Sequence, residues 1–192
     1  MSRKYTQLTF TDSVKQAQTH FGSRTMATNI EAWDIDDEHL SAEEKSFIAE
    51  RDSFYMATVN AEGWPYLQFR GGPAGFLKVL DESTLGYADF RGNRQYISTG
   101  NLRENDQVSL LFMDYANRRR LKVMARTEVF DAEQRPDLMT RVEDPDYRAR
   151  IERVVMFHVV AFDWNCPQHI TPRFTESEWA TVRQGPRQAD PS

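Results

Sequence analysis

The pattern of apolar and polar positions changes at Phe54. From there on, short runs rich in aromatic and β-branched residues alternate with polar positions and are separated by turn residues, which is typical of β-strands. The predicted strands are FYMATVN, WPYLQFRG, FLKVL, STLGYAD, DQVSLLFMD and the two longer segments 119–130 and 153–164. About seven strands at antiparallel spacing indicate a mainly β fold with flanking helices, a closed or split barrel rather than a parallel nucleotide-binding sheet.

Helical spacing of apolar residues occurs before and between these strands. Thr11 is positioned to cap a helix that ends at Gly22, and Ser41 opens a second helix in which Glu44 completes a capping box. Two further helices are predicted over residues 92–105 and 137–151.

These elements suggest one main domain with additions at both ends. We expect an N-terminal helical extension over 1–44, a barrel domain over 45–175, and a C-terminal helix remnant with a disordered tail over 176–192. Apolar strands such as SLLFM and VVMFHVV need cover on both faces, and a second copy of the chain would supply it. The sequence therefore predicts a homodimer.

Charge and composition exclude several classes of partner. The 192 residues carry a formal net charge of −5 at pH 7, so the overall field repels a polyanion such as DNA. The longest nearly uncharged apolar run, 154–162, is too short to cross a membrane. Cys166 is the single cysteine, and the N-terminus has neither an apolar signal core nor an Arg-rich transit pattern. We expect a cytoplasmic protein that binds neither nucleic acid nor a membrane.

Candidate chemistry is concentrated between Gln68 and Gln95. The segment 91–94 offers guanidinium groups, an amide and free backbone N–H groups, the donors that hold a phosphate monoester, although a solvated basic turn has the same composition. Arg70 shares a strand face with Tyr66 and Gln68, which fits either a ligand contact or a surface charge. Lys78 lies among apolar residues, where an anionic ligand or an extended path to solvent would accommodate its charge.

The order of the segments FYMATVNAEGWPYLQFRGG, GFLKVLDESTLGYADFRGNRQYIS, NLRENDQVSLLFMD and RRRLKVMARTEVF resembles the pyridoxamine 5′-phosphate oxidase-related family of FMN-binding split barrels. The resemblance covers about residues 45–175. It implies a homodimer with two FMN molecules at the interface, whose phosphates are held by arginine and lysine side chains. The implied FMN-binding residues are Arg70, Lys78, Tyr87, Ala88, Asn93, Arg94, Gln95, Arg120, Trp164 and Arg173.

Within this set, the resemblance implies different roles. Arg94 matches the phosphate arginine, and Gln95 stands where the family often has a lysine. Arg120 stands where many members have a glutamine that contacts the flavin ring. Trp164 and Arg173 resemble the late tryptophan and arginine that close over the flavin. Tyr87 and Ala88 line the flavin, and Arg70 and Lys78 match the arginine and lysine of the first strand pair.

The implied function is an FMN-dependent oxidoreductase acting on an unknown small molecule. The substrate-phosphate residues of a true pyridoxamine phosphate oxidase do not carry over, because only Arg135 fits while Asp131 and Met139 replace the expected tyrosine and serine. A non-catalytic flavin or haem carrier, or a barrel that uses the deazaflavin F420, remains an alternative. Catalytic residues are unassigned, and Cys166 with His169 gives too few ligands for a closed zinc site, so we expect no metal.

Overall fold

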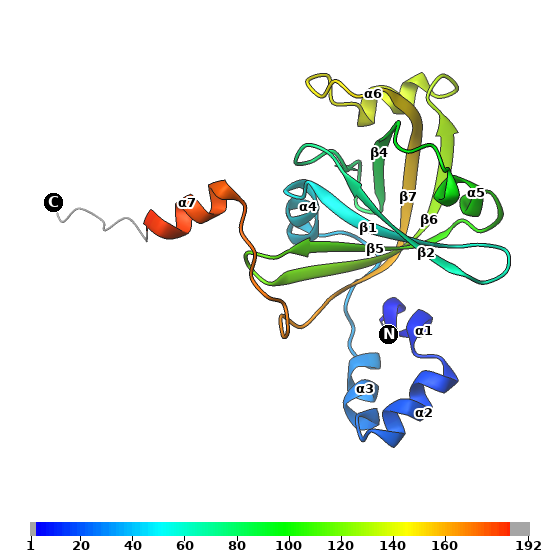
Figure 1. Ribbon diagram of the computed structural model, residues 1–192. Coiled ribbons are helices and arrows are strands. Elements are labelled where there is room, and N and C mark those ends of the chain that lie inside the picture. The colour runs from blue at the N-terminus through cyan, green and yellow to red at the C-terminus, as the bar shows by residue number, and fades with distance from the viewer. Residues whose placement is uncertain (1–2, 185–192) are drawn as a thin grey trace.

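The structure, a computed structural model, describes residues 3–184. Within these residues, seven strands form one antiparallel sheet in the order β2-β1-β5-β6-β7-β4-β3, coiled into a split barrel (Figure 1). The strands are β1 (Ser53–Val59), β2 (Pro65–Gly71), β3 (Lys78–Val79), β4 (Thr84–Phe90), β5 (Gln107–Asp114), β6 (Arg119–Asp131) and β7 (Ile151–Trp164). The helices are α1 (Lys4–Thr9), α2 (Asp12–His20), α3 (Arg24–Glu31), α4 (Ala42–Ala49), α5 (Ile97–Glu104), α6 (Pro136–Val142) and α7 (Glu176–Gln184). The mainly β fold with flanking helices is thus confirmed.

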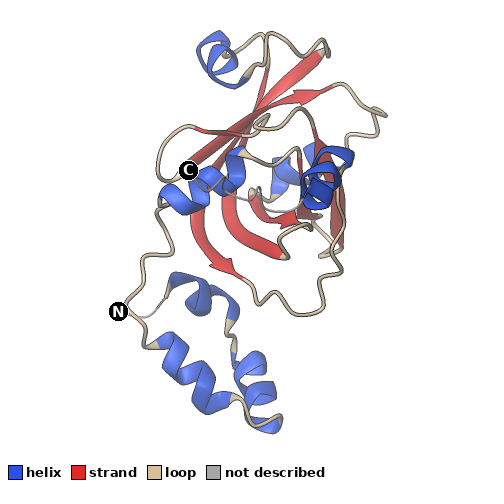
Figure 2. Ribbon diagram, turned by 90° about the vertical axis from the view of Figure 1, so that its left-hand side faces the viewer, coloured by secondary structure: helices blue, strands red, loops and turns tan. Residues whose placement is uncertain are grey.

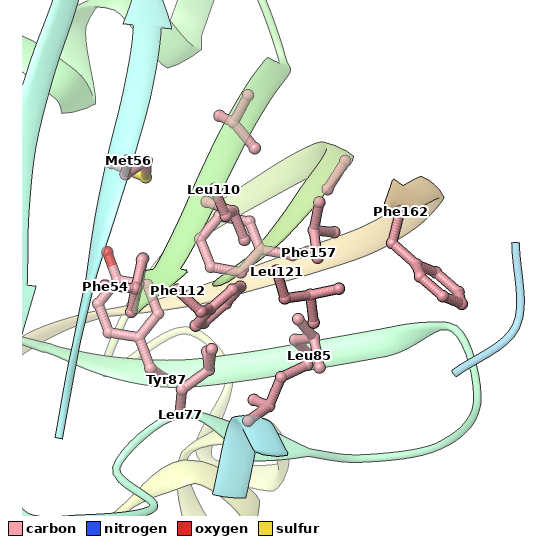
Figure 3. Packing of buried hydrophobic residues seen from close by; sticks show 14 of the residues in the cluster. Phe54, Met56, Leu77, Leu85, Tyr87, Leu110, Phe112, Leu121, Phe157 and Phe162 are labelled. Atoms are coloured by element: carbon pink, nitrogen blue, oxygen red, sulfur yellow. The ribbon is translucent and has the colours of Figure 1, made fainter. Parts of the chain in front are cut away.

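The inward side chains of the strands fill the barrel. Burial alternates along β1, so Phe54 and Met56 are buried while Tyr55 between them is half-buried. The centroid of the Phe54 ring lies 5.5 Å from that of Phe112 and 5.6 Å from that of Tyr87 (Figure 3). Buried aromatic rings contribute much of the stability of a core. The alternation of buried and exposed side chains along each strand fixes how the strands pair.

Helix α6 covers the outer face of β4 and β7. Its Leu138 and Val142 pack with Val154 and Met156 of β7. A Cβ atom at Gly86 would lie 3.0 Å from both Val142 and Met156, so a larger residue would force these neighbours apart. The second face of this part of β7 is therefore covered by the same chain, and not by a partner as the sequence argument supposed.

The two capped helices predicted before the barrel are confirmed. The side chain of Thr11 accepts a hydrogen bond from the backbone N–H of Val14 at the start of α2. Ser41 and Glu44 form the predicted capping box at the start of α4. This helix crosses the expected domain boundary at residue 44.

The two helices predicted between strands are shorter than expected. Helix α5 begins at Ile97 instead of residue 92, because Arg94 and Tyr96 have left-handed backbone conformations, with φ of 63° and 56°, through which a helix does not continue. Helix α6 ends at Val142 instead of residue 151, since Pro145 disfavours helical backbone at the residue before it. The sequence pattern misses α1 and α3, and FLKVL forms only a two-residue strand.

The terminal helices lie outside the barrel (Figures 1 and 2). Helices α1 to α3 lie beside one end of it, where Nη2 of Arg3 donates to Oδ1 of Asp163 on β7 at 2.6 Å. Helix α7 extends away from it, and the tail expected to be disordered lies outside the described residues. No helix within residues 3–184 is long and apolar enough to cross a membrane.

Candidate functional site

A pocket of about 210 Å³ opens between β2, the loop after β4 and the start of α5. Its lining combines three arginines with amide, hydroxyl and aromatic side chains. The lining residues are Tyr66, Gln68, Arg70, Phe90, Gly92, Asn93, Arg94, Gln95, Tyr96, Ile97, Ser98, Thr99 and Arg153. Four of the ten residues predicted to bind the cofactor, Arg70, Asn93, Arg94 and Gln95, therefore meet in one place.

Strand β2 presents one polar face to this pocket. Tyr66, Gln68 and Arg70 alternate with outward residues, as the sequence predicts. They face the barrel because Arg70 pairs in register with Phe54, whose side chain is in the core. The hydroxyl of Ser98 at the start of α5 donates to Oε1 of Gln68 at 2.9 Å, which joins the strand to the helix.

The loop from Gly92 to Tyr96 forms the opposite wall. The side-chain oxygen of Asn93 accepts a hydrogen bond from the backbone N–H of Gln95 at 3.2 Å. Arg94 and Tyr96 both have positive φ, a conformation that costs a residue with a side chain about 1–2 kcal/mol. Arg94 precedes α5 by three residues, so it does not start a helix as expected, but its side chain lines the pocket. Strained backbone of this kind is concentrated at functional sites.

A buried ion triad lies behind the pocket. Asp89 of β4, 3% exposed, accepts hydrogen bonds from Nη1 of Arg70 at 3.0 Å and from Nε and Nη2 of Arg153 at 2.9 and 2.7 Å. Burial alone would lower the pKa of Arg153, and its hydrogen bonds to Asp89 raise that pKa above its ordinary value. The sequence places Asp89 in the candidate segment 68–95 without a role, and it does not point to Arg153. The available signal was Asp89 itself, a charged residue between the run LGYA and Phe90, since a buried charge requires a partner.

Two predicted flavin-lining residues, Tyr87 and Ala88, have buried side chains. The Tyr87 ring stacks on Phe157 inside the barrel (Figure 3), and Ala88 packs beneath α6. Burial, together with the negative charge of Asp89, raises the pKa of the Tyr87 phenol well above its ordinary value. Its hydroxyl has no hydrogen-bond partner among residues 3–184.

The remaining predicted residues lie elsewhere in the same chain. Lys78 lines a separate groove beside α4, and Arg120 lies on β6. Nε1 of Trp164 donates to Oε1 of Glu44 at 2.6 Å. The guanidinium of Arg173 lies 5.1 Å from the Tyr115 ring centroid, in a pocket of about 460 Å³.

The donors of the first pocket suit a phosphate group. Among the described residues, its lining includes three guanidinium groups and no carboxylate. Nε of Arg70 is buried and has no hydrogen-bond partner, so the pocket wall holds an unused donor. Forked guanidinium groups form the strongest contacts to phosphate oxygens, and a terminal phosphate is therefore the group that this pocket fits.

Histidines and acidic residues do not form a metal centre in the described part of the chain, which contains no group of three or more metal-binding side chains. His158 is half-exposed on β7, where Nε2 lies 3.3 Å from Oε2 of Glu128. The apolar run around it predicts a core or an interface residue, and the exposure of its side chain excludes the core.

Comparisons with known proteins agree with this architecture. The chain resembles the crystal structure of a putative pyridoxamine 5′-phosphate oxidase from Lactobacillus delbrueckii, with 22% identity, a TM-score of 0.50, and coverage of 67% of this chain and 97% of that chain. It also resembles HupZ from Group A Streptococcus, with 17% identity, a TM-score of 0.50, and coverage of 70% and 99%. At 22% and 17% identity, these similarities show a shared fold and not a shared function. No curated protein matches the sequence. The family model for pyridoxamine 5′-phosphate oxidase matches residues 40–163, and the chain therefore belongs to that family.

Proposed function

We propose that this protein binds FMN and acts as an FMN-dependent oxidoreductase on a small molecule. The observation that carries the proposal is the pocket lined by Arg70, Arg94 and Arg153, which has no carboxylate in its described lining. A terminal phosphate dianion matches this donor set, and the family to which the chain belongs supports FMN as its source.

The roles proposed for the residues follow from the donors that each offers. Arg94, Asn93 and Gln95 hold the phosphate from the loop, and Arg70 holds it from β2. Bound FMN supplies the redox chemistry, whereas the protein supplies position and charge. We assign no catalytic acid or base.

A homodimer would complete the site. Lys78, Arg120, Trp164 and Arg173 lie outside the pocket that holds Arg94, so in this proposal they reach the flavin from a second chain or from the rim. Tyr87 and Ala88 contribute through their backbone, because their side chains are buried.

Absorption spectroscopy and titration test this function. The purified protein should show flavin absorption bands, and protein stripped of its ligand should bind FMN at least tenfold more tightly than riboflavin, about 1.4 kcal/mol or more. A Soret band instead would indicate a haem protein, and equal affinity for FMN and riboflavin would contradict the proposed phosphate pocket. Repeated transfer of two electrons from a small-molecule donor to an acceptor, faster than with the same concentration of free FMN, would separate an enzyme from a carrier.

A further inference from the structure

The ion triad behind the pocket brings a third arginine to the same ligand. We propose that Arg153 of β7 contacts the phosphate of the cofactor and that Asp89 is the positioning residue that fixes the guanidinium of Arg153. This inference rests on the proposed function, since it concerns the same pocket. It adds a residue that is 64 positions away from Asp89 in the chain.

The geometry leaves one N–H donor of Arg153 for a ligand. Asp89 accepts from Nε and Nη2 of Arg153, and Glu152 accepts from Nη1 at 3.2 Å. These bonds use three of the five N–H donors of a guanidinium group and a hydrogen bond to the Tyr96 side chain uses a fourth, while the residue lines the pocket. The guanidinium group of Arg153 is therefore held by Asp89 on one edge and borders the pocket on another.

Three neighbours restrict the motion of this guanidinium. The Tyr96 ring lies beneath it, with the guanidinium carbon 5.0 Å from the ring centroid. The hydroxyl of Tyr96 donates to Oε2 of Glu152 at 3.2 Å, and Asp89 lies behind. A side chain fixed by such contacts loses little conformational entropy when it binds a ligand, which favours affinity.

The charge balance also favours an anion in front of the triad. Asp89 and Glu152 offset two of the three arginines that contact them, Arg70, Arg91 and Arg153, so this network carries one excess positive charge. The side chains of Arg70 and Arg153 are only 17% and 13% exposed, and water therefore screens this charge poorly. A phosphate in the pocket would provide the missing negative charge.

The test compares two ligands that differ only in the phosphate. Arg153→Met should weaken FMN binding about ten- to a hundredfold and change riboflavin binding less than about twofold, because only FMN meets the guanidinium. Arg153→Lys should recover part of the lost FMN affinity, since the lysine ammonium keeps the positive charge but cannot form the paired hydrogen bonds of a guanidinium group. Asp89→Glu keeps the charge but displaces both arginines, and it should also lower the ratio of FMN to riboflavin affinity.

Arg126→Met is the matched control, because Arg126 is an exposed arginine of β6 that pairs with Asp106 outside the pocket. It should leave both affinities unchanged. A merely structural role of Arg153 predicts equal losses for FMN and riboflavin or none, and either result would overturn the inference. If the wild-type protein binds no FMN, the proposed function itself fails. Arg153→Lys retains the pairing charge, so it keeps the test valid if Arg153→Met does not fold.

Discussion

At the scale of single residues, Arg94 combines a left-handed backbone conformation with a place in the lining of the proposed phosphate pocket. Arg94→Ala should weaken FMN binding about ten- to a hundredfold, a loss of roughly 1.5–3 kcal/mol, since a charge-assisted contact to the phosphate disappears. Arg94→Gly should lose the same affinity but raise the free energy of unfolding by up to about 1 kcal/mol relative to Arg94→Ala, because glycine accepts the φ of 63°. Flavin fluorescence titration and urea denaturation measure the two effects.

The control for this pair is Arg118, another arginine with positive φ, 54°, in the turn between β5 and β6. Arg118→Ala should leave FMN affinity unchanged, because Arg118 does not line the pocket. Wild-type affinity in Arg94→Ala would remove Arg94 from the proposed phosphate site.

The sequence allows prediction of individual site residues only where local patterns suffice. Alternation along β2 correctly places Tyr66, Gln68 and Arg70 on one face, because side chains two positions apart point the same way. The pairing of Asp89 with Arg153 escapes prediction, since this contact joins two strands 64 residues apart and no local period encodes that register. Long-range pairing is a property of the folded sheet, and only the buried charge hints at it.

At the scale of elements, the capping box of α4 also anchors the end of β7. Glu44 caps the helix with Ser41 and accepts from Nε1 of Trp164. Burial of Glu44 opposes ionisation, but the hydrogen bonds from Ser41 and Trp164 outweigh it and hold the pKa of this carboxyl below its ordinary value of 4.5. The stabilisation is therefore complete above pH 4.5 and is lost as the pH falls through the folded-state pKa.

Glu44→Gln should lower the free energy of unfolding at pH 7 by about 1–3 kcal/mol, because charge-assisted hydrogen bonds are lost, and the variant should show less loss of stability between pH 5 and pH 3 than the wild type. Urea denaturation at several pH values measures both quantities. Glu43→Gln is the control, since Glu43 is exposed and forms a surface ion pair with Arg119 that contributes little. An unchanged pH profile in Glu44→Gln would contradict this role of Glu44.

Element boundaries show where the sequence pattern stops being informative. The caps of α2 and α4 are predictable because the capping side chains lie within three residues of their partners. The start of α5 is not, since Arg94 and Tyr96 adopt left-handed conformations although neither is glycine or asparagine, the residues that signal such conformations in a sequence. The chain breaks a local rule at the place where we propose that the ligand binds.

At the scale of the whole molecule, the outer side of the barrel exposes an apolar face on β2. Leu67 and Phe69 are 64% and 57% exposed, and the Phe69 ring contacts Tyr55 on β1 with centroids 5.7 Å apart. Leu111 of β5 pairs in register with Tyr55 and extends the same face. Tyr55 and Leu111 are half-buried, so the exposed apolar side chains lie on β2, an edge strand of the sheet. Exposed apolar residues on an edge strand are typical of an interface between protein chains.

We predict that this face, Tyr55, Leu67, Phe69 and Leu111, forms the interface of a homodimer. The double variant Leu67→Lys with Phe69→Lys should sediment as a monomer at micromolar concentration, whereas the wild type should sediment as a dimer, because the charges would be buried without partners at the interface. If two chains share the flavin site, the monomeric variant should also bind FMN more weakly.

Phe21→Lys provides the control, since Phe21 is 81% exposed after α2 and lies off this face. The sedimentation of this variant should match that of the wild type. If the wild type is a monomer, a site built from two chains is excluded, and FMN binding is confined to the pocket around Arg94. If the double variant is still a dimer, the interface lies on another surface.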